Sequence, residues 1–162
     1  MDPQLRFGVS IALSFVTWGL VAKYYFWPAL RTHPGRAGFR PILLLHGFRF
    51  VGLAFLVPGV VSPALPFAFA GPAAYGDLVA AVLALATVGV LENSIGLLLL
   101  WAFNVWGAAD LLFAFYQGLI GVRVEPGQLG TMYFVVTVLV PLLLVTHALA
   151  FRMLLVARPR AA

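Results

Sequence analysis

The sequence predicts an all-α, polytopic transmembrane protein of about five helices packed as one bundle. Of its 162 residues, 63% are hydrophobic and 9% are charged, whereas soluble domains carry about 25% charged and roughly 45–50% apolar residues. One core in so short a chain cannot bury this much apolar surface, so the surplus is expected to face lipid. Five apolar stretches, separated by turn-forming or charged residues, supply the helices of a single domain spanning residues 1–162.

The first span is expected over residues 7–27. It carries no charge before Lys23 and closes with aromatic residues up to Trp27, as in an interfacial belt. At about 1.5 Å per residue it is roughly 30 Å long, enough to cross a bilayer. A basic loop with proline and glycine follows. The second span is expected over residues 41–60, because Pro41 suits a first helical position.

The middle of the chain is harder to divide. Residues 61–74 contain three prolines and no charge, so we expect an irregular segment lying on the membrane surface. The following apolar stretch is too long for one crossing. It is interrupted by Glu92-Asn93-Ser94, residue types that favour a turn and a new helix N-cap. We therefore expect spans over residues 76–91 and 94–118, with a single kinked element or a re-entrant pair as the alternative.

The fifth span is expected over residues 129–157, kinked where Pro141 removes a backbone donor. Five crossings put the basic loop after the first span on the same side as the basic C-terminus, whereas four would separate them. The positive-inside rule then places the N-terminus outside and the C-terminus in the cytoplasm of an inner membrane. The arginines of the cytoplasmic side are Arg31, Arg36, Arg40, Arg152, Arg158 and Arg160, against Arg6 and Arg123 outside.

Several classes of function find no support in the sequence. The absence of cysteine excludes disulfides, thiolate metal sites and cysteine nucleophiles. The basic residues flank apolar spans rather than forming an arm, so no nucleic-acid partner is expected. No glycine-rich phosphate loop, zinc-protease motif or nucleophile elbow is present, which argues against an enzyme. The expected partners are the bilayer and either a second membrane protein or another copy of the chain.

Polar residues inside the spans are the strongest functional pointers in such a chain. His46 and His147 each lie about five residues inside the cytoplasmic end of their spans, so we expect them at one depth, roughly 7 Å inside the boundary. Arg49 lies one helical turn deeper than His46 on the same face. Trp101 and Asn104 enter this region from the fourth span. The five residues predict a cytoplasm-facing pocket for a small lipophilic ligand.

Other interpretations of this group stay open. Two histidines at one depth could ligate haem iron axially, although neither lies in a haem-binding motif. With Arg49 they could instead hold a quinone or an anionic headgroup, or relay protons. In a purely structural interpretation, each histidine is hydrogen-bonded to a neighbouring helix and Arg49 snorkels to lipid phosphate.

Asp110 is the second candidate, about eight residues below the outer end of the fourth span and so roughly 12 Å into the membrane. Gly107 and Ala114, one turn to either side, indicate close contact with another helix. Ser14 and Thr137 are expected at a similar depth, where their hydroxyl groups would hydrogen-bond the carboxyl group. Asp110 is thus predicted either to carry a proton or a cation, or to bridge helices as a protonated acid.

Two further expectations concern the acids. An ion pair between Asp110 and Arg49 is not expected, because their depths differ by about 12 Å. Asp77 follows Gly76 at the expected start of the third span, where an acid caps a helix and suits its dipole.

A resemblance rests on three short segments. They are His46-Gly47-Phe48-Arg49, Gly76-Asp77 and Asn104-x-x-Gly107-x-x-Asp110, and they resemble a group of uncharacterised small bacterial membrane proteins over roughly Leu43 to Gly118. The resemblance implies a multi-span protein and no particular activity.

The leading hypothesis is a non-enzymatic inner-membrane protein that binds a small lipophilic ligand or a membrane partner. The alternatives are a redox subunit that uses haem or quinone at His46 and His147, and a small proton- or cation-coupled carrier that uses Asp110. No other metal site is expected.

Overall fold

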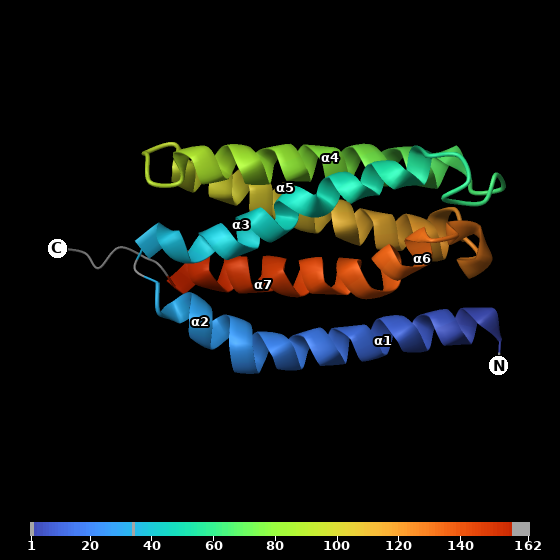
Figure 1. Cartoon of the computed structure of the whole chain (residues 1–162), viewed down its shortest axis with the longest axis horizontal. Helices are drawn as coiled ribbons and strands as arrows, with labels where there is room; N and C mark the ends of the chain where they lie inside the picture. Colours follow the sequence, from blue (N-terminus) through green and yellow to red (C-terminus); the bar gives the residue numbers. More distant parts are fainter. Residues whose placement is uncertain (1, 34, 157–162) are drawn as a thin grey trace.

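The structure, a computed structural model, describes residues 2–33 and 35–156. These residues form a helical bundle without β-strands, and five helical elements are long and apolar enough to cross a membrane. The elements run alternately up and down along one long axis, and the chain starts at the end opposite to where α7 finishes (Figure 1). The predicted fold class is confirmed.

The first helical element is continuous from Pro3 to Arg31 and stands at the edge of the bundle (Figure 1). It consists of α1 (Pro3–Val21), a π-helical turn (Ala22–Phe26) and α2 (Trp27–Arg31). Only 11% of its most apolar stretch is buried, against 44% in the last element. The first element therefore leaves most of its apolar surface for lipid to cover.

The second helical element begins at Gly35, six residues earlier than expected. It joins a 3₁₀ turn (Gly35–Phe39), α3 (Arg40–Gly47) and a 3₁₀ segment (Phe48–Leu56). A 3₁₀ run of nine residues is unusual. The early start places Arg49 well inside the element instead of near its first turns.

The third helical element corrects the expectation for residues 61–74. α4 runs over Phe67–Val90 and includes Pro72, so half of the supposed surface segment is helical. Pro72 removes one backbone hydrogen bond in the second helical turn. Burial offsets that loss, because Ala70, Ala73 and Ala74 of this region are buried in the bundle. Prolines are tolerated in membrane-spanning helices where neighbouring helices support the backbone.

The fourth helical element, α5 (Gly96–Tyr116) with a π-helical turn (Gln117–Gly121), is separate from α4. A tight turn joins them, with backbone hydrogen bonds from Asn93 N to Val90 O and from Gly96 N to Asn93 O. The prediction of two crossings divided near residues 92–94 is therefore confirmed.

The last helical element is assembled from short pieces. A 3₁₀ turn (Pro126–Leu129) leads to α6 (Met132–Phe134), a π-helical turn (Val135–Leu139) and α7 (Val140–Val156). Pro141 is the second residue of α7, so the irregularity expected there takes the form of the π-helical turn directly before it. The expected end of this span, Ala157, lies outside the described residues.

Candidate functional site

Arg49 is the centre of a buried ionic group. Its side chain is fully buried, and each arm of the guanidinium has a partner. Nε donates to Asp77 Oδ1 at 2.7 Å, Nη2 to Asp110 Oδ2 at 2.6 Å and Nη1 to the Gly107 carbonyl at 3.1 Å. Three helical elements, the second, third and fourth, are joined by this one side chain. We call Arg49, Asp77 and Asp110 the ionic triad.

The pair between Arg49 and Asp110 overturns the depth argument against it. Arg49 lies 14 residues after the start of its helical element at Gly35, and Asp110 lies 14 residues after the start of α5 at Gly96. Both starts lie at the same end of the bundle, since Arg36 Nη1 donates to the carbonyl of Asn93 in the turn that precedes α5. At about 1.5–2.0 Å per residue both residues lie at least roughly 21 Å from that end. The two depths agree because the second helical element begins at Gly35 and not at Pro41.

Asp77 is not a helix cap, and that prediction is wrong. It is the eleventh residue of α4, whose N-cap is Pro66, and its carboxylate is held by Arg49. The span was expected to start at residue 76, whereas α4 starts at Phe67, so Asp77 lies inside the helix instead of at its first turn. A signal was present in the sequence: Asp77 and Asp110 lie 16 and 17 residues from Asn93, which places them at one depth in an antiparallel pair.

Three glycines let the helices approach the triad closely. A Cβ atom at Gly52 would overlap the Asp77 carboxylate, and one at Gly76 would overlap the Asp110 carboxylate. At Gly107 a Cβ would meet the imidazole of His147 and, at 2.8 Å, Nη1 of Arg49. The close contact expected beside Asp110 from its small-residue face is thus present at Gly107.

The histidines form a second buried network behind Arg49. Arginine only donates, so His147 Nε2, 3.5 Å from Arg49 Nη1, has to accept. The proton of His147 is then on Nδ1 and is donated to Asn104 Oδ1 at 2.7 Å. The Thr146 hydroxyl bonds to backbone carbonyls of its own helix, so it accepts from His46 Nε2 at 2.9 Å. His147 is therefore neutral in this arrangement, while Nδ1 of His46 is buried and has no hydrogen-bond partner among the described residues.

This network does not fit axial haem ligation. The rings of His46 and His147 are in contact, with centroids 4.2 Å apart. With nitrogen–metal bonds of about 2 Å, a shared metal ion would hold the two ligating nitrogens about 4 Å apart and the ring centres farther still. No porphyrin plane can lie between rings in contact. The described residues also contain no group of three or more His, Cys, Asp or Glu side chains arranged to hold a metal.

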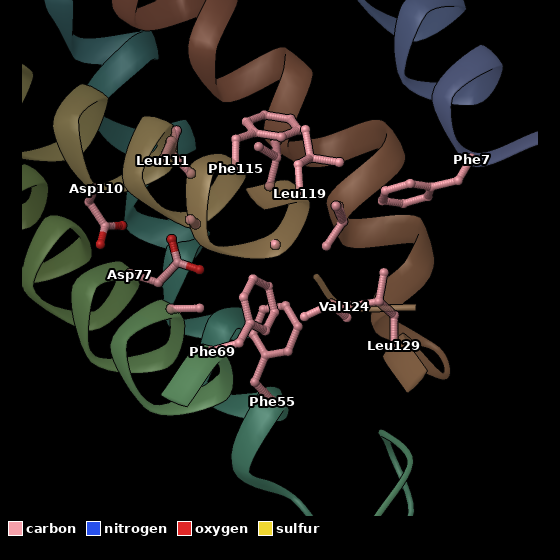
Figure 2. A pocket seen from close by; sticks show the side chains of 15 residues that line it. Phe7, Phe55, Phe69, Asp77, Asp110, Leu111, Phe115, Leu119, Val124 and Leu129 are labelled. Atoms are coloured by element: carbon pink, nitrogen blue, oxygen red, sulfur yellow. The ribbon is translucent and has the colours of Figure 1, made fainter. Parts of the chain in front are cut away.

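A pocket opens on the other side of the triad (Figure 2). It holds about 590 Å³ of empty space, its open mouth included. Asp77 and Asp110 line it, each with 12% of its side chain exposed. The remaining walls are apolar and come from all five helical elements and from the loop before α6. They include Phe7, Phe55, Phe69, Leu111, Phe115 and Leu129.

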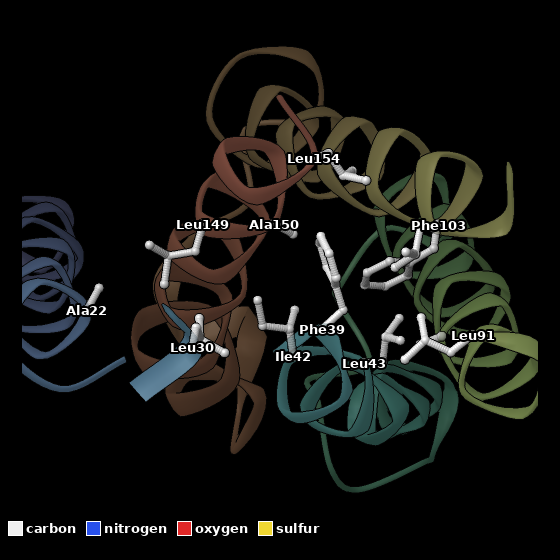
Figure 3. Close-up of a cluster of buried hydrophobic side chains, with 12 residues drawn as sticks. Ala22, Leu30, Phe39, Ile42, Leu43, Leu91, Phe103, Leu149, Ala150 and Leu154 are labelled. Atoms are coloured by element: carbon white, nitrogen blue, oxygen red, sulfur yellow. The ribbon is translucent and has the colours of Figure 1, made fainter. Parts of the chain in front are cut away.

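The pocket leads from the middle of the bundle towards one end only. Leu129 and Val124 of its wall lie in the connection between α5 and α6, at the end where the chain begins. Towards the opposite end, buried hydrophobic side chains fill the space between the helices (Figure 3). These include Phe39, Leu43, Leu91, Leu100 and Phe103.

The residues proposed from sequence are distributed unevenly around this site. His46, Arg49, Asn104 and His147 lie together in the buried networks, but they line neither this pocket nor a second apolar one beside Leu30 and Ile42. Trp101 is half-buried near Phe151, with ring centroids 6.1 Å apart.

The hydroxyl groups expected at Asp110 do not bind it. Thr137 donates to the Tyr133 carbonyl of its own helix at 2.8 Å, and Ser14 is half-buried on α1. Among the described residues, Arg49 supplies the hydrogen bond to the Asp110 carboxylate.

Comparison with known proteins gives one match. A family model described as a domain of unknown function (DUF8737) matches residues 6–155, almost the whole chain. No curated protein and no solved structure matches.

Proposed function

The chain belongs to the DUF8737 family, a domain of unknown function, and from the site it carries we propose a non-enzymatic integral protein of the bacterial inner membrane that binds a small lipophilic ligand. The observation that carries this proposal is the pocket beside the ionic triad. Ligand sites are concave and mostly apolar, with a few polar groups that orient the ligand. The pocket combines apolar walls with two carboxylates at its inner end.

The distribution of basic residues supports the orientation. Arg36 bonds to the turn between α4 and α5, Arg40 pairs with Glu92 of that turn, and Arg152 lies over the Trp27 ring at 3.8 Å. These contacts gather the positive charges at one end of the bundle, which the positive-inside rule assigns to the cytoplasm. The pocket then opens towards the outer face.

The same geometry favours binding over transport. A carrier that used Asp110 would need a path from the carboxylate to both faces of the membrane. The pocket supplies a path towards one end, while the buried hydrophobic side chains around Leu43 and Phe103 occupy the other. A membrane partner, the other part of the leading hypothesis, would have to dock on the lipid-facing surface and would leave this pocket unexplained.

Photolabelling tests the binding role directly. The protein is placed in phosphatidylcholine nanodiscs and irradiated with a ten-carbon alcohol that carries a diazirine. We expect cross-links in the wall segments 69–73 and 111–119. Ala114→Phe, which fills the pocket, should lower this labelling at least about fivefold, a free-energy change of about 1 kcal/mol.

The matched control is Ala109→Phe on the exposed face of the same helix, which should leave the labelling unchanged. Labelling that spreads over lipid-facing residues, equally in both variants, would overturn the proposal.

A further inference from the structure

The ionic triad does not balance in charge when all three of its members are ionised. Arg49 contributes one positive charge, and Asp77 and Asp110, each within salt-bridge distance of it, contribute two negative charges as carboxylates, which leaves a net charge of −1. The neighbouring His147 is neutral in the hydrogen-bond network described above, and His46 lies behind it, in ring contact, without lining the pocket. No lysine or arginine of the described residues lines the pocket. A single uncompensated negative charge in a low-dielectric interior is strongly destabilising.

We propose that the ligand supplies the missing charge and is a lipophilic amine carrying one positive charge. Its ammonium group lies against Asp77 and Asp110 at the inner end of the pocket, and its apolar body fills the space towards the outer end. This inference rests on the proposed ligand-binding function and names the chemical class of that ligand.

The pocket discriminates against the other classes of lipophile. A fatty acid would bring a third carboxylate next to two existing ones, and like charges repel strongly in such a site. A neutral alcohol would leave the net charge unchanged. A dication would carry more positive charge than the net charge of −1 requires, since Arg49 already neutralises one carboxylate. The aromatic rings of Phe55, Phe69 and Phe115 in the walls also favour a cation over an anion.

Competition against the diazirine alcohol tests the charge preference. Decylamine, decanol and decanoate have equal chain lengths, and at pH 7.5 an alkyl amine is protonated. Zwitterionic phosphatidylcholine nanodiscs avoid attraction of the amine to anionic lipid. We expect decylamine to displace the label at a concentration at least about tenfold lower than decanol, equivalent to about 1.4 kcal/mol, and decanoate to displace it least.

Carboxylate variants assign the preference to the triad. In Asp110→Asn and Asp77→Asn, the advantage of decylamine over decanol should fall to within about twofold. Photolabelling of the pocket by the neutral alcohol should persist, which reports that the variants are folded. Glu92→Gln removes an acid from the exposed turn and should preserve the advantage.

The outcomes separate the two proposals. If the alcohol labels the pocket but decylamine and decanol compete equally in the wild-type protein, the charge inference is wrong and the binding role stands; a proton then balances the triad. If the advantage of decylamine survives in both asparagine variants, the triad does not select the cation and the inference is also wrong. If the alcohol never labels the pocket, the binding role itself fails.

Discussion

Replacement of Arg49 by methionine tests whether the ionic triad holds the bundle together. The substitution keeps an apolar stem of similar length and removes the donors that reach Asp77, Asp110 and Gly107 at 2.7, 2.6 and 3.1 Å. Breaking a buried ion pair by removal of one partner costs about 3–5 kcal/mol, because a buried charge is left without compensation. We expect Arg49→Met to lower the free energy of unfolding by that amount, measured by steric trapping in bicelles.

Two comparisons make this result specific. Arg40→Met removes an exposed pair with Glu92 at 3.5 Å and should cost no more than about 1 kcal/mol. Adding Asp77→Asn and Asp110→Asn to Arg49→Met should restore at least about 2 kcal/mol, since no buried charge then lacks a partner. If Arg49→Met costs no more than Arg40→Met, or if the triple variant is less stable than Arg49→Met alone, the triad does not stabilise the bundle as argued.

Two further predictions concern helix packing and orientation. Gly76→Ala should destabilise the protein by about 1–3 kcal/mol, because the added methyl group overlaps the Asp110 carboxylate. Gly89→Ala on the same helix meets no atom within 4 Å and should be neutral or slightly stabilising. Equal unfolding free energies of the two variants would refute the packing argument. The chain lacks cysteine, so Gly127→Cys should react with a membrane-impermeant maleimide in intact spheroplasts and Ser94→Cys only after lysis; the reverse pattern would invert the proposed topology.

The number of helices was predictable because the bilayer requires each span to have a minimum length and an apolar composition. Span length and hydropathy are properties of the sequence itself, and the turn at Glu92–Ser94 is marked by polar residues within an apolar stretch. Pro72 does not break the helix as its local preference predicts, because packing of the alanines around it outweighs that preference.

The site could be predicted in part only. Arg49 and Asp110 stand out as charges within apolar spans, but their pairing depends on where each helix begins. The second helical element begins at Gly35, six residues before its expected start, so the expected depths of the two residues did not match. The pocket was not predictable, because its walls come from residues such as Phe7, Phe69 and Leu129 that are distant in sequence and individually ordinary. Side-chain packing between helices has no periodic signature to detect.

The order of synthesis gives the ionic triad a consequence for biogenesis. Arg49 leaves the ribosome 28 residues before Asp77 and 61 residues before Asp110, so at about 5–20 residues per second it waits roughly 3–12 s for its second counter-ion. An arginine at the centre of a lone helix costs about 2.5–3.5 kcal/mol to insert. The second helical element therefore carries this cost without its carboxylate partners until the next two elements emerge. A nascent chain that stops between these codons holds Arg49 in the membrane without its second carboxylate.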